Sequence, residues 1–120
     1  MVEEVPMPFY LHQASYTPEA LSRLIANPQD RTEVIRGPIE KLGGKIQEMY
    51  FAFGEYDAIL ITEFPDNVSA AAIALAFASG GALRSFQTTA LMTRAEALEA
   101  MRKANQSGYK PFTASAAAAR

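Results

Sequence analysis

Cysteine is absent from the 120 residues of this chain, which excludes disulfides, thiolate metal sites and cysteine nucleophiles. A basic run is absent too, and the net charge is −2, so the sequence indicates neither nucleic acid nor a membrane surface as a partner. The longest apolar stretch, residues 70–78, is far too short to cross a bilayer. The acidic start, residues 1–4, lacks the apolar region of a signal peptide. We therefore expect a cytoplasmic protein without a membrane segment.

What the chain does contain is ordinary globular composition, with 49% hydrophobic and 20% charged residues. A chain of this length can bury a core of its own. We expect one domain over residues 1–108, followed by a flexible tail over residues 109–120, most of which is of low complexity.

Two extended runs at the centre, residues 45–53 and 56–64, predict a β-hairpin. Gly54-Glu55 suits a two-residue turn, because glycine at the first turn position adopts positive φ without steric cost. Paired around that turn, Met49 opposes Leu60 and Tyr50 opposes Ile59. Since side chains alternate across a strand, one face carries Met49, Phe51, Ala58 and Leu60, and the other carries Ile46, Tyr50, Ile59 and Ile61. Both faces are largely apolar, so we expect both to be covered.

Helix and strand signals flank the hairpin. Residues that cap free backbone N–H groups predict the helix starts at Thr17, Asp30 and Thr93, and at Asp66 or Asn67. Pro38, inside the second helical segment, predicts a kink or break. The expected elements are a strand over 7–16, helical segments from 18 and from about 30 to 42, the hairpin, a helix over about 67–79, a strand over 82–93 and a helix after 93.

This order, β-α-β-β-α-β plus a C-terminal helix, is that of an α+β, ferredoxin-like fold with a four-stranded antiparallel sheet. Right-handed crossovers place both crossover helices on one face of the sheet. The other face would then be apolar and open, so we predict a homodimer, or a larger assembly, held together through the open sheet face.

Five residues are candidates for a ligand site. His12 is the single histidine; it is either a proton-moving group or a buried histidine bonded to its neighbours, and the second is more common. Tyr56 and Asp57 follow the turn, where the carboxylate anchors a ligand or locks the backbone. Tyr10 and Tyr50 line a cavity or belong to the core. No catalytic residue, cofactor site or metal site is predicted, because one histidine cannot build a multi-histidine site.

The stretch Gly54-Glu55-Tyr56-Asp57 at this hairpin, with residues 42–53 before it and Pro65-Asp66-Asn67 after it, resembles the GYD-domain family. The similarity extends over roughly residues 8–96. The resemblance implies a dimeric α+β barrel and implies no particular reaction.

Two functions remain open. The first is the binding of a small, largely apolar molecule in a pocket of the dimeric barrel, with His12, Tyr50 and Asp57 as polar groups. The second is a cofactor-independent monooxygenase- or isomerase-like enzyme that acts on an aromatic substrate, with His12 moving the proton. A purely structural oligomer is a third reading.

Overall fold

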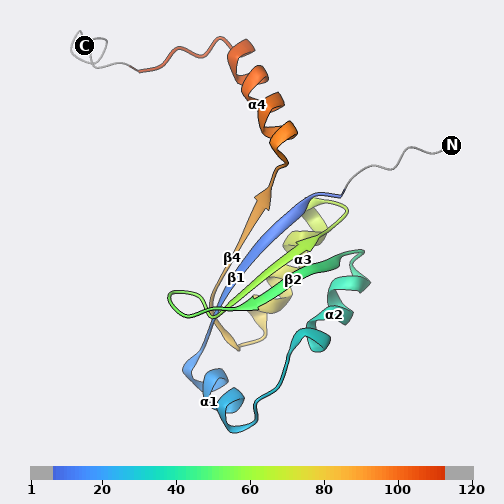
Figure 1. The fold of residues 1–120 in the computed structure, drawn as a ribbon, viewed down its shortest axis with the longest axis vertical. Coiled ribbons are helices and arrows are strands. Elements are labelled where there is room, and N and C mark those ends of the chain that lie inside the picture. Colours follow the sequence, from blue (N-terminus) through green and yellow to red (C-terminus); the bar gives the residue numbers. More distant parts are fainter. Residues whose placement is uncertain (1–6, 113–120) are drawn as a thin grey trace, which may run out of the picture.

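The computed structural model describes residues 7–112, and they form a four-stranded antiparallel sheet with the crossover helices against one face (Figure 1). The strand order is β2-β3-β1-β4, which confirms the predicted ferredoxin-like α+β topology. The elements are β1 (Phe9–Tyr16), α1 (Pro18–Ala26), α2 (Thr32–Lys41), β2 (Lys45–Phe51), β3 (Ala58–Glu63), α3 (Asn67–Ser79), β4 (Leu83–Leu91) and α4 (Arg94–Gln106).

The core lies between the sheet and the two crossover helices. Ile39 of α2 and Ile73 of α3 are fully buried against the ring of Phe64, which follows β3. In Figure 1 α3 lies behind the sheet, and α2 lies beside β2. We call this helix-covered side of the sheet the inner face and the opposite side the outer face.

Three of the predicted helix caps are present. The side chain of Thr17 accepts the N–H of Ala20, and Thr93 forms a reciprocal capping box with Glu96. Asp66 caps α3 by accepting the N–H of Ser69. These side-chain acceptors satisfy backbone donors that a helix start leaves free.

Helix α2 differs from its prediction in two places, the N-cap position and Pro38. Asp30 accepts the backbone N–H and the hydroxyl of Thr32, so Arg31 occupies the N-cap position without a side-chain cap bond. Of the predicted kink or break at Pro38, the break is wrong, because α2 continues through it to Lys41; the kink stays a prediction.

The hairpin register is confirmed where the strands pair regularly. Met49 opposes Leu60 and Tyr50 opposes Ile59. A register shift between Ile46 and Glu48 then adds one residue to β2. The face predicted for Ile46 was therefore wrong: Ile46 packs against the inner core, because one extra residue turns every side chain beyond it to the other face.

The connection between β2 and β3 is longer than the predicted two-residue turn. The Ala52 N–H donates to the Asp57 carbonyl at 2.8 Å, which closes a loop of residues 53–56. The hydroxyl of Ser15 donates to the Glu55 carbonyl, and Tyr56 reaches Gln87 of β4. The loop is thus folded back over the end of the outer face instead of forming a minimal hairpin.

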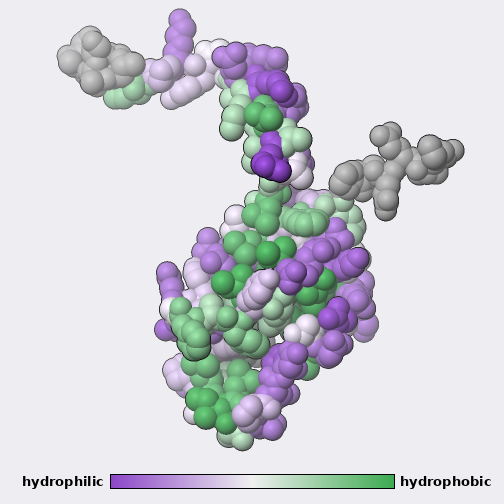
Figure 2. Space-filling view, in the orientation of Figure 1, coloured by the Kyte–Doolittle hydropathy of each residue, from purple (hydrophilic) through white to green (hydrophobic). Residues whose placement is uncertain are grey.

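No described helix covers the remaining outer face. The view of Figure 2 looks onto it, and hydrophobic side chains gather over the strands there. Helix α4 projects away from the sheet (Figure 1) and makes no substantial contact with another described element. None of the helices within residues 7–112 has the length and apolar character needed to span a membrane. The predicted tail reaches beyond residue 112, outside the described residues, and the predicted domain boundary at 108 stays a prediction.

Candidate functional site

A cavity of about 310 Å³ opens between the inner face of the sheet, α2 and α3. Its floor comes from all four strands, which contribute His12, Met49, Leu60 and Phe86. The helices and the segment after α3 supply the walls, where alanines and Gly80 leave room. Most of the lining is apolar, which is the usual composition of small-molecule pockets.

His12 lies in this lining, deep on β1, and it is only 1% exposed. Its Nδ1 is 2.9 Å from the Thr88 hydroxyl and its Nε2 is 2.8 Å from the Thr62 hydroxyl. Burial lowers the pKa of His12 to about 4, so the ring is neutral at pH 7. Both nitrogens are satisfied by neighbouring strands, which is the common structural role that the sequence suggested.

Aromatic rings extend from His12 along one side of the pocket. The imidazole stacks on Phe86 with ring centroids 5.7 Å apart and an interplanar angle of 22°. Phe77 of α3 meets Phe86 edge-to-face, at 5.9 Å and 81°. This cluster gives the pocket a rigid apolar wall that suits a flat or branched ligand body.

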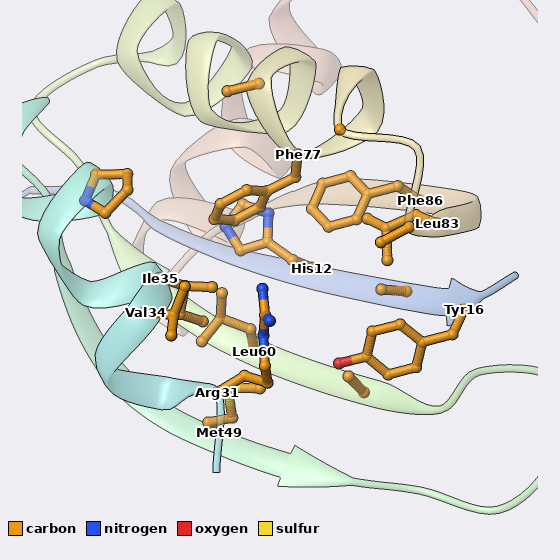
Figure 3. Close-up of a pocket in the computed structure, with 16 residues that line it drawn as sticks. His12, Tyr16, Arg31, Val34, Ile35, Met49, Leu60, Phe77, Leu83 and Phe86 are labelled. Carbon is orange, nitrogen blue, oxygen red and sulfur yellow. The ribbon is translucent and has the colours of Figure 1, made fainter. Parts of the chain in front are cut away.

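Two polar side chains face the same space from the other side. Figure 3 shows Arg31 pointing toward His12 and the Tyr16 hydroxyl directed toward Arg31. Burial raises the pKa of Tyr16, the Arg31 guanidinium opposes that rise, and Asp57 adds to it. Within residues 7–112, neither the guanidinium nor the phenol hydroxyl makes a hydrogen bond or an ion pair with another side chain.

The other predicted site tyrosines on the strands lie elsewhere. Tyr10 is buried in the core, where its hydroxyl donates to Asn67 Oδ1 at 2.6 Å. Tyr50 is on the outer face and 55% exposed. Neither lines the cavity that contains His12, so a ligand role for these two residues stays a prediction.

Tyr56 and Asp57 lie at the end of the sheet. The Tyr56 hydroxyl donates to Gln87 Oε1 at 2.8 Å. The Asp57 Oδ2 accepts the backbone N–H of Tyr16 at 2.9 Å, while the Asp57 N–H donates to the Ala14 carbonyl. Asp57, just before β3, is therefore hydrogen-bonded to β1 through both its side chain and its backbone N–H.

Asp57 also borders a second, wider groove of about 660 Å³ between α1 and the β2–β3 loop. Its rim carries exposed apolar side chains, among them Ile25, Phe51 and Phe53. This groove is open surface without a convergent set of polar groups, so we regard the inner cavity as the candidate site. Residues 7–112 contain no group of three or more His, Asp or Glu side chains placed to hold a metal ion.

Sequence reasoning found His12 but missed Arg31. Tyr16 shares the alternation of His12 along β1, so its place on the inner face could be read from the strand pattern. Arg31 precedes α2 and belongs to no periodic pattern; it enters the pocket only because α2 packs beside β2.

The fold and the pocket define an α+β protein of the ferredoxin-like type, with a lined cavity beneath its helices. The family model of the GYD domain matches residues 10–101. The chain therefore belongs to the GYD-domain family. A comparison with curated proteins finds no match.

Solved structures with a similar fold include the crystal structure of MtbAldR, with a TM-score of 0.50 and 15% identity. The alignment covers 78% of this chain and 62% of that one. The C-terminal domain of the MgtC protein from Mycobacterium tuberculosis gives a TM-score of 0.48 and 10% identity, covering 75% of this chain and 94% of that one. An AsnC-family transcriptional regulator from Agrobacterium tumefaciens gives 0.49 and 16%, covering 78% and 60%. This chain thus spans about three fifths of the MtbAldR and AsnC-family chains, and the likeness concerns the fold.

Proposed function

We propose that the protein is a small-molecule-binding homodimer whose ligand, a small and largely apolar compound, occupies the inner cavity. The observation that carries this proposal is the cavity itself. It holds about 310 Å³ of space beside His12, whose two ring nitrogens are both hydrogen-bonded to threonine hydroxyls. That volume lies at the small end of the range for ligand pockets, roughly 300–1,000 Å³.

Binding is favoured over catalysis by the state of His12. A general base needs a free nitrogen within reach of the proton that it abstracts. Here each ring nitrogen is already bonded to a threonine hydroxyl, and burial keeps the pKa of His12 near 4. His12 is well suited to shape the pocket and poorly suited to move a proton at neutral pH.

A pocket-filling substitution tests the site. Ala76 lines the cavity from α3 yet is exposed to solvent, so Ala76→Phe can enter the cavity without displacing the core. Ala78→Phe, on the same helix but outside the lining, is the matched control. With indole as an uncharged aromatic probe, we expect calorimetry to detect binding to the native protein and the control but not to Ala76→Phe. Equal binding by all three proteins, or by none, would contradict the proposed site.

The homodimer is proposed from the outer face. Leu11 opposes Ile61 at its centre, with Phe9 and Leu91 paired beside them. Phe9 is 42% exposed and Leu11, Ile61 and Leu91 are partly exposed. Soluble proteins rarely leave a continuous apolar patch of more than a few hundred Å² uncovered. A second copy packed on this face would cover it and close the barrel.

Ile61→Lys tests the dimer, because it places a charge at the centre of the proposed interface. Val68→Lys on α3, where the side chain is 79% exposed on the opposite side of the sheet, is its control. Light scattering should give about twice the 13.0 kDa chain mass for the native protein and for Val68→Lys, and the single-chain mass for Ile61→Lys. A native protein that is monomeric at micromolar concentration would refute the dimer.

We also propose a cytoplasmic location, which rests on the sequence features given above. Fractionation of cells that express the tagged protein would test it, and recovery in a membrane or secreted fraction would contradict it.

A further inference from the structure

We propose that the ligand of the inner cavity is a monocarboxylate with an aromatic or branched apolar body, whose carboxylate is held by Arg31 and Tyr16. This inference rests on the proposed function, because it names the ligand class for the same cavity. It goes beyond that function by assigning a charge and two recognition residues.

The first support is the charge of the lining. Arg31 is the one lining side chain that is charged at pH 7, because the lining contains no carboxylate and no other basic residue apart from neutral His12. Asp30 is adjacent in sequence, but its carboxylate is bonded to Thr32 and does not line the cavity. The cavity therefore carries about one positive charge, which one anionic group neutralises.

The second support is the unused hydrogen-bonding capacity. Within the described part of the chain, the guanidinium of Arg36 in α2 pairs with Glu33 at 3.2 Å, whereas the guanidinium of Arg31, just before α2, has no such partner. Arginine presents its donors in a planar fork that matches a carboxylate. The Tyr16 hydroxyl is directed toward the Arg31 side chain (Figure 3) and adds a third donor on the same side of the cavity.

The third support is the separation of polar and apolar surface. The donors of Arg31 and Tyr16 lie on one side, and the rings of Phe77 and Phe86 form the wall on the other. A ligand that satisfies both sides has an anionic end and an apolar body. One arginine and one phenol match a singly charged carboxylate better than a phosphate dianion, which needs more donors.

Matched acids and amides test the charge assignment. Phenylacetate and 4-methylpentanoate, each with its neutral amide, are titrated into the native protein at pH 7 by calorimetry. We expect at least one acid to bind more tightly than its amide, by about 10- to 100-fold, the value of a hydrogen bond to a charged group. Arg31→Met should abolish this preference and leave amide binding unchanged.

Three controls make the result decisive. Arg36→Met removes the same charge five residues further along, in α2 and outside the cavity, and should retain the preference. Tyr16→Phe should weaken acid binding by about 10-fold, the low end of the value of a hydrogen bond to a charged group. Ala76→Phe should abolish binding of acid and amide alike.

The outcomes separate the two proposals. Equal binding of acids and amides, unchanged in Arg31→Met but lost in Ala76→Phe, would overturn the carboxylate assignment and leave the proposed function intact. Binding of neither acids nor amides would overturn the carboxylate assignment together with the proposed function. Acid binding that survives in Ala76→Phe would place the acid outside the cavity and would also overturn this inference.

Discussion

Acid should destabilise this fold through His12, before the carboxylates titrate. The ring is 1% exposed, and burial lowers its pKa from 6.5 to about 4. Below pH 6.5 the unfolded chain binds a proton that the folded chain cannot bind until the pH falls to about 4. The free energy of unfolding should therefore fall by about 1.4 kcal/mol per pH unit within this window, and by about 3 kcal/mol in all.

The chain has one histidine, so any effect of histidine titration on the free energy of unfolding comes from His12. Urea unfolding is followed at pH 7.0, 6.0, 5.0 and 4.5, at one protein concentration because the stability of the proposed dimer would depend on concentration. His12→Leu keeps the apolar volume but removes the titrating group, so its unfolding free energy should change much less over the same range. The pKa values of Asp30 and Asp66 are lowered by hydrogen bonds from Thr32 and Ser69. Their stabilisation is lost only as the pH falls below 3.8, in native and variant alike.

This prediction is refuted if the unfolding free energies of the native protein and of His12→Leu change in parallel with pH. If native protein and His12→Leu lose stability equally between pH 6.5 and 4.5, the folded ring binds protons as readily as the unfolded one. His12 would then not be buried with both ring nitrogens hydrogen-bonded to the hydroxyls of Thr88 and Thr62.

Three further predictions concern single contacts. Gly44→Ala places a Cβ against the ring of buried Phe64 and should cost about 1–3 kcal/mol by overpacking, measured by urea unfolding; an unchanged midpoint would show that the ring moves freely. Asp57→Ala leaves the Tyr16 N–H without its acceptor and should cost about 1–3 kcal/mol, whereas Asp57→Asn, which keeps an oxygen, should cost less; equal losses would contradict the backbone role. Thr62→Val keeps the side-chain shape but removes a partner of the imidazole and should lower the melting temperature by several degrees; no change in calorimetry would mean that water replaces the hydroxyl.

The fold was predictable because its signals are local and repeated. Alternation along β1 and β3, and the capping side chains of Thr17 and Thr93, each concern a few neighbouring residues. Once the element order was known, connection rules left few topologies. The errors lie where a single residue changes the geometry: the extra residue between Ile46 and Glu48 leaves the apolar pattern of β2 unchanged yet moves Ile46 to the other face.

The candidate site was only half predictable for a related reason. His12 and Tyr16 lie on the inner face by strand alternation alone. Arg31 and Phe77 join them because α2 and α3 approach the sheet from different places in the chain. Such a meeting is a property of tertiary packing, and no spacing within one segment records it.

The cavity lies where the inner face changes from large to small side chains. At one end Phe64 and Ile39 fill the space between sheet and helices completely. At the other end the lining includes the small side chains of Ala14, Ala58 and Ala76, which leave room for the cavity between the layers. Protein interiors otherwise pack as densely as organic crystals, and unfilled volume lowers stability. Larger side chains at these positions would remove that cost, and under the proposed function the ligand fills the space instead. Ala76→Phe should then separate stability from ligand binding. The variant should be at least as stable as the native protein but should no longer bind the ligand.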